Sequence, residues 1–121
     1  MAQNILHHMA LEELKAKNMV LYNEYTLLFD GLVKLMRQVF QKNEELRKLS
    51  NLSQLYNMQE NQAFIEMLIH HDNQTYRKHF YLGKDKKQFI VGLNGEGNGF
   101  PTAEACLKKI TFDLKTEHLI D

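Results

Sequence analysis

Apolar residues recur every seven positions between Leu11 and Leu49, and no proline interrupts this part of the chain. Ten of the twelve a and d positions of this heptad pattern are apolar. A repeat that keeps its register over this length indicates a long amphipathic helix. We predict one helix from about residue 4 to 49, about 70 Å long at ~1.5 Å per residue. The stripe consists of Leu11, Leu14, Leu21, Tyr25, Leu28, Leu32, Leu35, Val39, Leu46 and Leu49.

Two places within the stripe bear on how the helix runs. Asp30-Gly31 is a turn signal, and a glycine inside a helix costs roughly 1 kcal/mol relative to alanine. The heptad phase is the same on both sides of Gly31, which favours a continuous helix. Asn18 falls at an a position, where a buried asparagine fixes the register of paired helices. A partly exposed asparagine near a helix end fits that position equally well.

The apolar face of this helix is wider than the seam of a two-stranded coil. Tyr22, Phe29 and Met36 occupy e positions, which are mostly charged in simple coiled coils, and Val33 and Phe40 widen the apolar stripe further. A face of this width needs more than one partner, so we predict a helical bundle.

Residues 50–71 are predicted to form a second helix, which folds back on the first. "NMQE" at 57–60 has the form of a capping box. A helix of that length reaches back only to about residue 30 and leaves the N-terminal stripe uncovered. We therefore expect a homo-oligomer, with a dimer favoured, or a partner protein on that stripe. The predicted interface residues are Leu11, Leu14, Asn18, Leu21, Tyr25 and Leu28.

The C-terminal part has strand composition followed by a helix pattern. We predict strands at 75–82 and 87–93 joined by the polar turn "GKDK", and a possible short third strand near 98–100. Thr102 is a suitable N-cap for a helix to about Lys115. The predicted fold is α+β, with a helical oligomerisation region at 1–72 and a ββα sheet-plus-helix module at 73–121.

The candidate binding site lies on the predicted hairpin. The chain as a whole carries no net charge, but five basic and one acidic side chain give residues 76–87 a local charge of +4. Strand alternation places Phe80 and Leu82 toward the C-terminal helix and Tyr81 with the cations on the other side. Cations interleaved with aromatic surface suit nucleic acid. An acidic protein partner, or no direct role, remains open. The candidate residues are Arg77, Lys78, His79, Tyr81, Lys84, Lys86 and Lys87.

The segment "YRKHFYLGKDKKQFIVGLNGEGNGFPTAEACLKKI" resembles small sheet-plus-helix modules of the AP2 and integrase arm-binding type. In that family a hairpin leads to a helix start that "GFPTAEAC" approximates, although the aromatic pattern of the third strand is missing here. The resemblance implies a DNA-binding sheet face, carried by Arg77, His79, Tyr81 and the turn lysines. It covers less than a third of the chain.

We find no pattern that specifies catalysis. The glycines at 95, 97 and 99 have neither dinucleotide nor Walker spacing. The pairs His7-His8 and His70-His71 diverge on a helix and make poor metal chelators. Cys106, the single cysteine, reads as a core residue in a reducing compartment. We therefore expect neither an enzyme nor a bound cofactor or metal.

The N-terminus lacks the features of a secretory signal, and no apolar run is long enough to span a membrane. We expect a cytoplasmic protein without membrane contact. The preferred hypothesis is a non-catalytic homo-oligomeric regulatory protein that binds nucleic acid through its hairpin. The alternative is an adaptor, secretion chaperone or inhibitor that captures a partner on the N-terminal apolar stripe.

Overall fold

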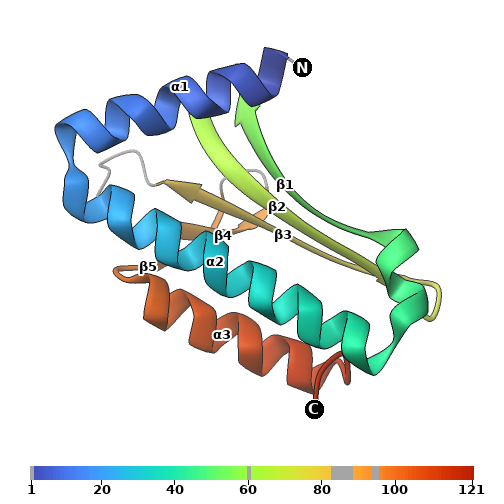
Figure 1. Cartoon of the computed structure of the whole chain (residues 1–121). Helices are drawn as coiled ribbons and strands as arrows, with labels where there is room; N and C mark the ends of the chain where they lie inside the picture. The colour runs from blue at the N-terminus through green and yellow to red at the C-terminus, as the bar shows by residue number, and fades with distance from the viewer. Residues whose placement is uncertain (1, 60, 83–88, 94–95) are drawn as a thin grey trace.

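The computed structural model describes residues 2–59, 61–82, 89–93 and 96–121. Two helices and a short 3-10 helix precede five strands, and a third helix ends the chain (Figure 1). The elements are α1 (Ala2–Lys17), α2 (Met19–Lys42), η1 (Glu44–Leu49), β1 (Ser50–Asn57), β2 (Gln62–His71), β3 (Gln74–Leu82), β4 (Phe89–Leu93), β5 (Glu96–Phe100) and α3 (Ala103–Thr116).

The five strands form one antiparallel sheet in sequence order, with β1 and β5 at its two edges. The helices lie on one face of this sheet, and α2 and α3 run side by side across it (Figure 1). α1 crosses the sheet near the end of β1 and the start of β2 (Figure 1). The predicted class of mixed helix and sheet is therefore confirmed, whereas the predicted helical hairpin is not.

The core lies between the helices and the sheet, because each element buries one set of alternating or heptad-spaced side chains there. Strands β2 and β3 contribute Ile65, Met67, Ile69, Tyr76 and Phe80. The helices contribute most of the predicted stripe together with one face of α3. The helical members are Leu14, Leu21, Tyr25, Leu28, Leu32, Leu35, Met36, Val39, Ala103, Cys106, Ile110 and Leu114.

The single helix predicted from 4 to 49 is wrong in two places. It breaks at Asn18, whose non-helical backbone (φ −151°, ψ 81°) separates α1 from α2. The Asn18 side chain accepts a hydrogen bond from the Leu21 backbone N–H at 3.1 Å, so this residue is the N-cap of α2. The chain leaves the α-helix again at Asn43, which is the N-cap of η1.

Gly31 lies within α2, and the helix continues through it as predicted. The absence of a side chain at Gly31 lets Leu107 of α3 pack closely against α2. A Cβ built on Gly31 would lie 2.7 Å from Leu107 Cδ2 and 3.1 Å from Leu107 Cγ, and closer still to Cδ1. The Asp-Gly pair therefore marks a close helix crossing in place of a turn.

The second helix predicted for residues 50–71 is wrong, because this segment forms the hairpin of β1 and β2. Ala63, Ile65, Met67 and Ile69 are buried at alternate positions, which is the period of a strand. Short apolar runs of this kind satisfy helical and strand spacing at once, and the β-branched isoleucines favour the strand. The predicted boundary at 72/73 falls in the turn between β2 and β3, and core residues come from both sides of it.

The predictions for the C-terminal part agree with the structure where it is described. β3 covers the predicted strand at 75–82, β4 begins at Phe89, and β5 is the possible third strand. Thr102 caps α3 by accepting a hydrogen bond from the Ala105 N–H at 3.1 Å. The predicted turn "GKDK" lies outside the described residues.

Candidate functional site

The predicted nucleic-acid site divides between the two faces of β3. Arg77, His79 and Tyr81 share the face opposite the helices, as their register with Leu68, Glu66 and Phe64 of β2 shows. Lys78 lies on the other face, with its Nζ 5.7 Å from the centroid of the Tyr76 ring. The predicted site residues Lys84, Lys86 and Lys87 lie outside the described residues.

We call the face opposite the helices the open face. Glu66 lies at its centre and offsets part of its positive charge. One of its carboxylate oxygens is 2.8 Å from His79 Nε2 and 3.7 Å from Arg77 Nε. His79 Nδ1 is buried and has no hydrogen-bond partner among the described residues. Within the described part of the face, the cation of Arg77 is therefore balanced by an acid beside it.

The aromatic side chains of the open face pack against each other. The rings of Phe64 and Tyr81 stack with centroids 4.7 Å apart, and both residues are buried. The His79 ring lies 5.0 Å from Phe64 and 6.0 Å from Tyr81. None of the three belongs to the main core, so they form a second small cluster. Stacking a base on this cluster requires Tyr81, which is 3% exposed, to move.

The N-terminal stripe predicted to remain uncovered is largely buried within the single chain. Leu14, Leu21, Tyr25 and Leu28 are core residues, and Leu11 packs against them. The premise of an uncovered stripe is wrong, because β1 and β2 occupy the space that a 22-residue back-folded helix does not reach. A homo-oligomer stays a prediction, but these residues do not provide an exposed surface for it.

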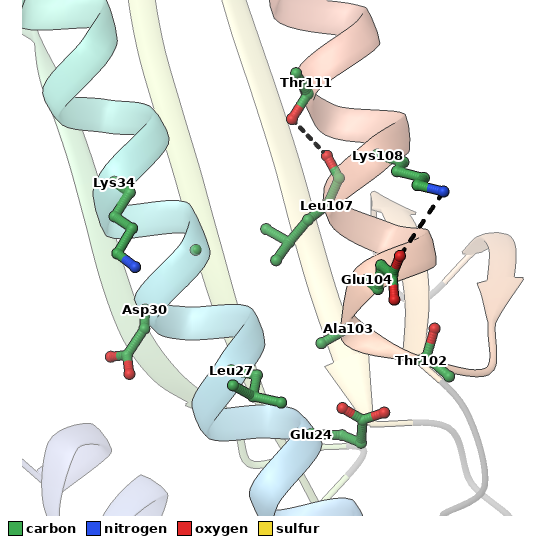
Figure 2. A pocket seen from close by; sticks show the side chains of 11 residues that line it. Glu24, Leu27, Asp30, Lys34, Thr102, Ala103, Glu104, Leu107, Lys108 and Thr111 are labelled. Carbon is green, nitrogen blue, oxygen red and sulfur yellow. Dashed lines mark hydrogen bonds and ion pairs between the residues drawn. The ribbon is translucent and has the colours of Figure 1, made fainter.

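A shallow groove runs between α2 and α3 along the flank where Gly31 and Leu107 meet (Figure 2). Leu107 points across it toward α2, and the Lys108–Glu104 ion pair lies on its α3 rim at 3.8 Å (Figure 2). The groove encloses about 760 Å³. Its rim carries both signs of charge, from Glu24, Asp30, Lys34, Glu104 and Lys108. This mixture selects no particular charge in a ligand.

A second groove lies on the other flank of α2, where the helix faces η1 and the first residues of β1. Phe29, Val33, Met36 and Phe40 form its apolar wall, and Leu52 lies opposite. The groove encloses about 370 Å³. Phe29, Val33 and Phe40 are only partly buried, although they continue the wide apolar face of α2. We call this the α2–β1 groove; it is also lined by Arg37, Arg47, Ser50 and Asn51.

The charged lining of the α2–β1 groove is basic only. Arg47 lies over the Phe40 ring at 4.8 Å and pairs with Glu44 at 2.7 Å. Arg37 is exposed and makes no ion pair with any residue that the structure describes. The Ser50 hydroxyl is buried and likewise has no partner in the described part of the chain. The groove therefore combines apolar surface with an available cation.

A buried histidine, His7, links α1 to β1 and to α2. His7 is 3% exposed, with Nδ1 2.7 Å from the Leu55 carbonyl and Nε2 2.5 Å from the Tyr25 hydroxyl. Burial lowers the pKa of His7. His7 Nδ1–H donates to the Leu55 carbonyl, and the Tyr25 hydroxyl donates to Gln54 Oε1 at 2.8 Å.

The described residues offer little for catalysis. Burial raises the pKa of the Cys106 thiol to about 12, and this residue is fully enclosed in the core. His79 lies on the opposite sheet face, so the two do not form a nucleophile and base. No group of three potential metal ligands occurs within residues 2–59, 61–82, 89–93 and 96–121. No described helix is long and apolar enough to cross a membrane.

Comparison with protein-family models, with curated protein sequences and with solved structures gives no match to this chain. The resemblance of residues 76–110 to sheet-plus-helix DNA-binding modules thus gains no support from these comparisons. Its hairpin corresponds to the β3–β4 part of a longer five-stranded sheet.

Sequence reasoning identified the wide apolar face of α2 but not the groove beside it. Arg37, Arg47 and Asn51 carry no motif, and they meet only because η1 and β1 return along α2. The available signal was the set of apolar residues outside the heptad stripe, including Phe29 and Phe40. That signal was interpreted as a surface for further helices, whereas the chain places an edge strand there.

Proposed function

We propose that this chain is a non-catalytic protein-binding module and that the α2–β1 groove is its binding surface. The observation that carries the proposal is the partly exposed apolar row Phe29, Val33 and Phe40 beside an edge strand. Apolar and aromatic side chains flanked by arginines are the composition enriched in protein interfaces. This role corresponds to the adaptor, chaperone or inhibitor hypothesis, with a different surface from the one expected from the heptads.

The direct test is site-specific photo-crosslinking in cells that make the protein. A photoreactive amino acid at Val33 should give partner adducts, whereas one at Lys108, on α3 at the opposite flank of α2, should give none. Val33 is partly exposed and Lys108 is exposed, so both positions accept the probe without a core change. Adducts of the same partners in equal yield at both positions, or no adduct at Val33, would contradict the proposal.

Nucleic-acid binding by the β3–β4 hairpin is a second proposal. Arg77, with half of its side chain exposed, and the sequence position of the three turn lysines favour it. Binding should weaken steeply with salt, since each phosphate contact releases counterions. Reversing Lys84, Lys86 and Lys87 to glutamate should abolish retention of DNA and RNA oligonucleotides, and reversing Lys15, Lys34 and Lys48 should not. Absence of retention by the wild-type chain at low ionic strength would refute this proposal.

A further inference from the structure

β1 is an edge strand with little of the protection that such strands usually carry. Its sequence, "SNLSQLYN", contains no charged residue and no proline. Soluble proteins normally blunt exposed edges with lysine, proline, bulges or a covering element. Here the cover is α1, whose His7 bonds the Leu55 carbonyl near the end of the strand. The first half of β1 lies outside this contact.

The direction of the Leu55 carbonyl identifies which backbone groups face outward. In an antiparallel ladder, the N–H and C=O of one residue point to the same side of the strand. Because the Leu55 carbonyl accepts a hydrogen bond from His7 of α1, we infer that it points away from β2. Asn51 and Ser53, four and two residues before it, then direct their N–H and C=O groups to the same edge. No hydrogen bond from the described residues reaches these backbone groups from that side. Together they offer about four hydrogen-bonding groups to an added strand.

The α2–β1 groove lies directly beside this open half-edge. Ser50, Asn51 and Leu52 form its β1 side, and the row Phe29, Val33 and Phe40 forms its α2 side. Alternate side chains of a strand point to the same face. A segment paired with Asn51 and Ser53 would therefore direct every second side chain into the groove. Backbone pairing and apolar burial are thus available to one extended ligand.

The charge of the groove selects among occupants. Arg37 and Arg47 line it, and no acidic residue does. A second copy seated there by a two-fold axis would bring the arginines of both chains into one isologous interface, which is unfavourable. An acidic segment instead supplies a carboxylate for Arg37, whose guanidinium has no ion-pair partner in the described part of the chain.

We propose that the α2–β1 groove binds an extended acidic segment of another protein, which adds to the β1 edge as a sixth strand. Its backbone pairs with Asn51 and Ser53, its apolar side chains contact Phe29, Val33 and Phe40, and its acidic side chain pairs with Arg37. This inference rests on the proposed function and specifies the partner's chemistry and conformation.

The probe is a labelled peptide of about nine residues, with threonine at odd positions and valine alternating with glutamate at even positions. Fluorescence anisotropy should show at least about tenfold tighter binding than for the same peptide with lysine in place of glutamate. Arg37→Glu should reverse this preference, whereas the control Arg77→Glu, on the open sheet face, should leave it unchanged. Circular dichroism of both variants verifies that they are folded.

Backbone pairing is tested by N-methylation of the acidic peptide. Methylating the alternate residues whose N–H groups face β1 should weaken binding by about tenfold or more, because it removes those donors. Methylating the other set should change it less than about twofold. Amide hydrogen exchange should slow at Asn51 and Ser53 when the unmodified peptide is bound.

Equal effects of the two methylation patterns, equal binding of the acidic and basic peptides, or absence of binding would overturn the inference. Protection of Asn51 and Ser53 without peptide, together with a dimeric mass by light scattering, would identify a second copy as the occupant and also overturn it. The proposed function fails separately, because it depends on the crosslinks formed at Val33 whatever the conformation of the partner.

Discussion

The two flanks of α2 differ in what covers them. On one flank α3 packs so closely that a side chain at Gly31 would displace Leu107. On the other flank Phe29, Val33 and Phe40 remain partly exposed above the first residues of β1. The first flank is a completed helix pair, whereas the second has apolar surface, arginines and an unpaired strand edge. The same helix thus pairs with α3 on one side and lines the proposed binding surface on the other.

The largest loss of stability is expected at His7, where α1 covers the Leu55 end of the β1 edge. His7→Ala removes a ring that bonds both Leu55 and Tyr25 and leaves a cavity. Losing buried hydrogen bonds and volume together costs about 2–4 kcal/mol. Urea unfolding measures this loss. The control His8→Ala, at an exposed neighbour, should change the free energy of unfolding by less than about 0.5 kcal/mol.

An equal cost for the His7 and His8 variants would show that α1 is not held through His7. Hydrogen exchange at the Leu55 end of β1 should also accelerate in the His7 variant, since its cover is loosened. The open half at Asn51 and Ser53 should exchange at the same rate in both proteins.

The closed flank is probed at Gly31. An alanine in an exposed helix is normally about 1 kcal/mol better than glycine. Here Gly31→Ala should lose that gain and destabilise by up to about 1 kcal/mol, because the Leu107 side chain must shift to admit the added methyl group. In a Leu107→Ala background the same change should become stabilising. Thermal or urea unfolding of the double-mutant cycle gives the sign, and a gain in both backgrounds would contradict the close approach.

The pH dependence of stability sharpens the comparison further. The pKa of His7 is lowered in the folded chain from its ordinary value of 6.5. Below about pH 6.5 the unfolded chain binds a proton at this residue that the folded chain binds less readily, so stability falls as pH decreases. The contribution is bounded by about 1.4 kcal/mol per pH unit. The contribution is measured by urea unfolding at several pH values, as the difference between the wild-type and His7→Ala free energies of unfolding. Identical slopes of this free energy against pH in the two proteins would refute it.

The smallest effect is expected on the open flank itself. Ser50→Ala deletes a buried hydroxyl that has no partner among the described residues. Removing an unsatisfied polar atom is neutral or slightly stabilising, by up to about 1 kcal/mol. The matched change Thr102→Ala removes the N-cap of α3 and should cost about 1 kcal/mol. A comparable loss for Ser50→Ala would mean that its hydroxyl has a partner.

Some elements could be predicted because the information lies within a few residues of one another. The stripe from Leu21 to Val39, the N-cap Thr102 and the strand around Phe80 are all specified by local spacing. Asn18 lies at the boundary of what local pattern predicts. Of its two interpretations, a position near a helix end is local and agrees with its role as the N-cap of α2, whereas fixing the register of paired helices depends on a distant partner.

Residues 50–71 could not be assigned in this way. Leu52, Leu55, Phe64 and Leu68 fit helical spacing, while Ile65, Met67 and Ile69 fit a strand. The choice depends on whether β3 is available as a pairing partner, which is a property of distant sequence. The candidate site has the same dependence, because Arg37, Arg47 and Asn51 become neighbours only through that hairpin.

The sequence by itself determined where apolar surface occurs and which local periodicity most elements follow, since both depend on neighbours within one or two turns. Tertiary structure alone decided that β1 becomes a sheet edge, that His7 covers one half of it and that the wide face of α2 borders the other. The physical reason is that burial and strand pairing are settled between segments far apart in the chain, where no local pattern records the partner.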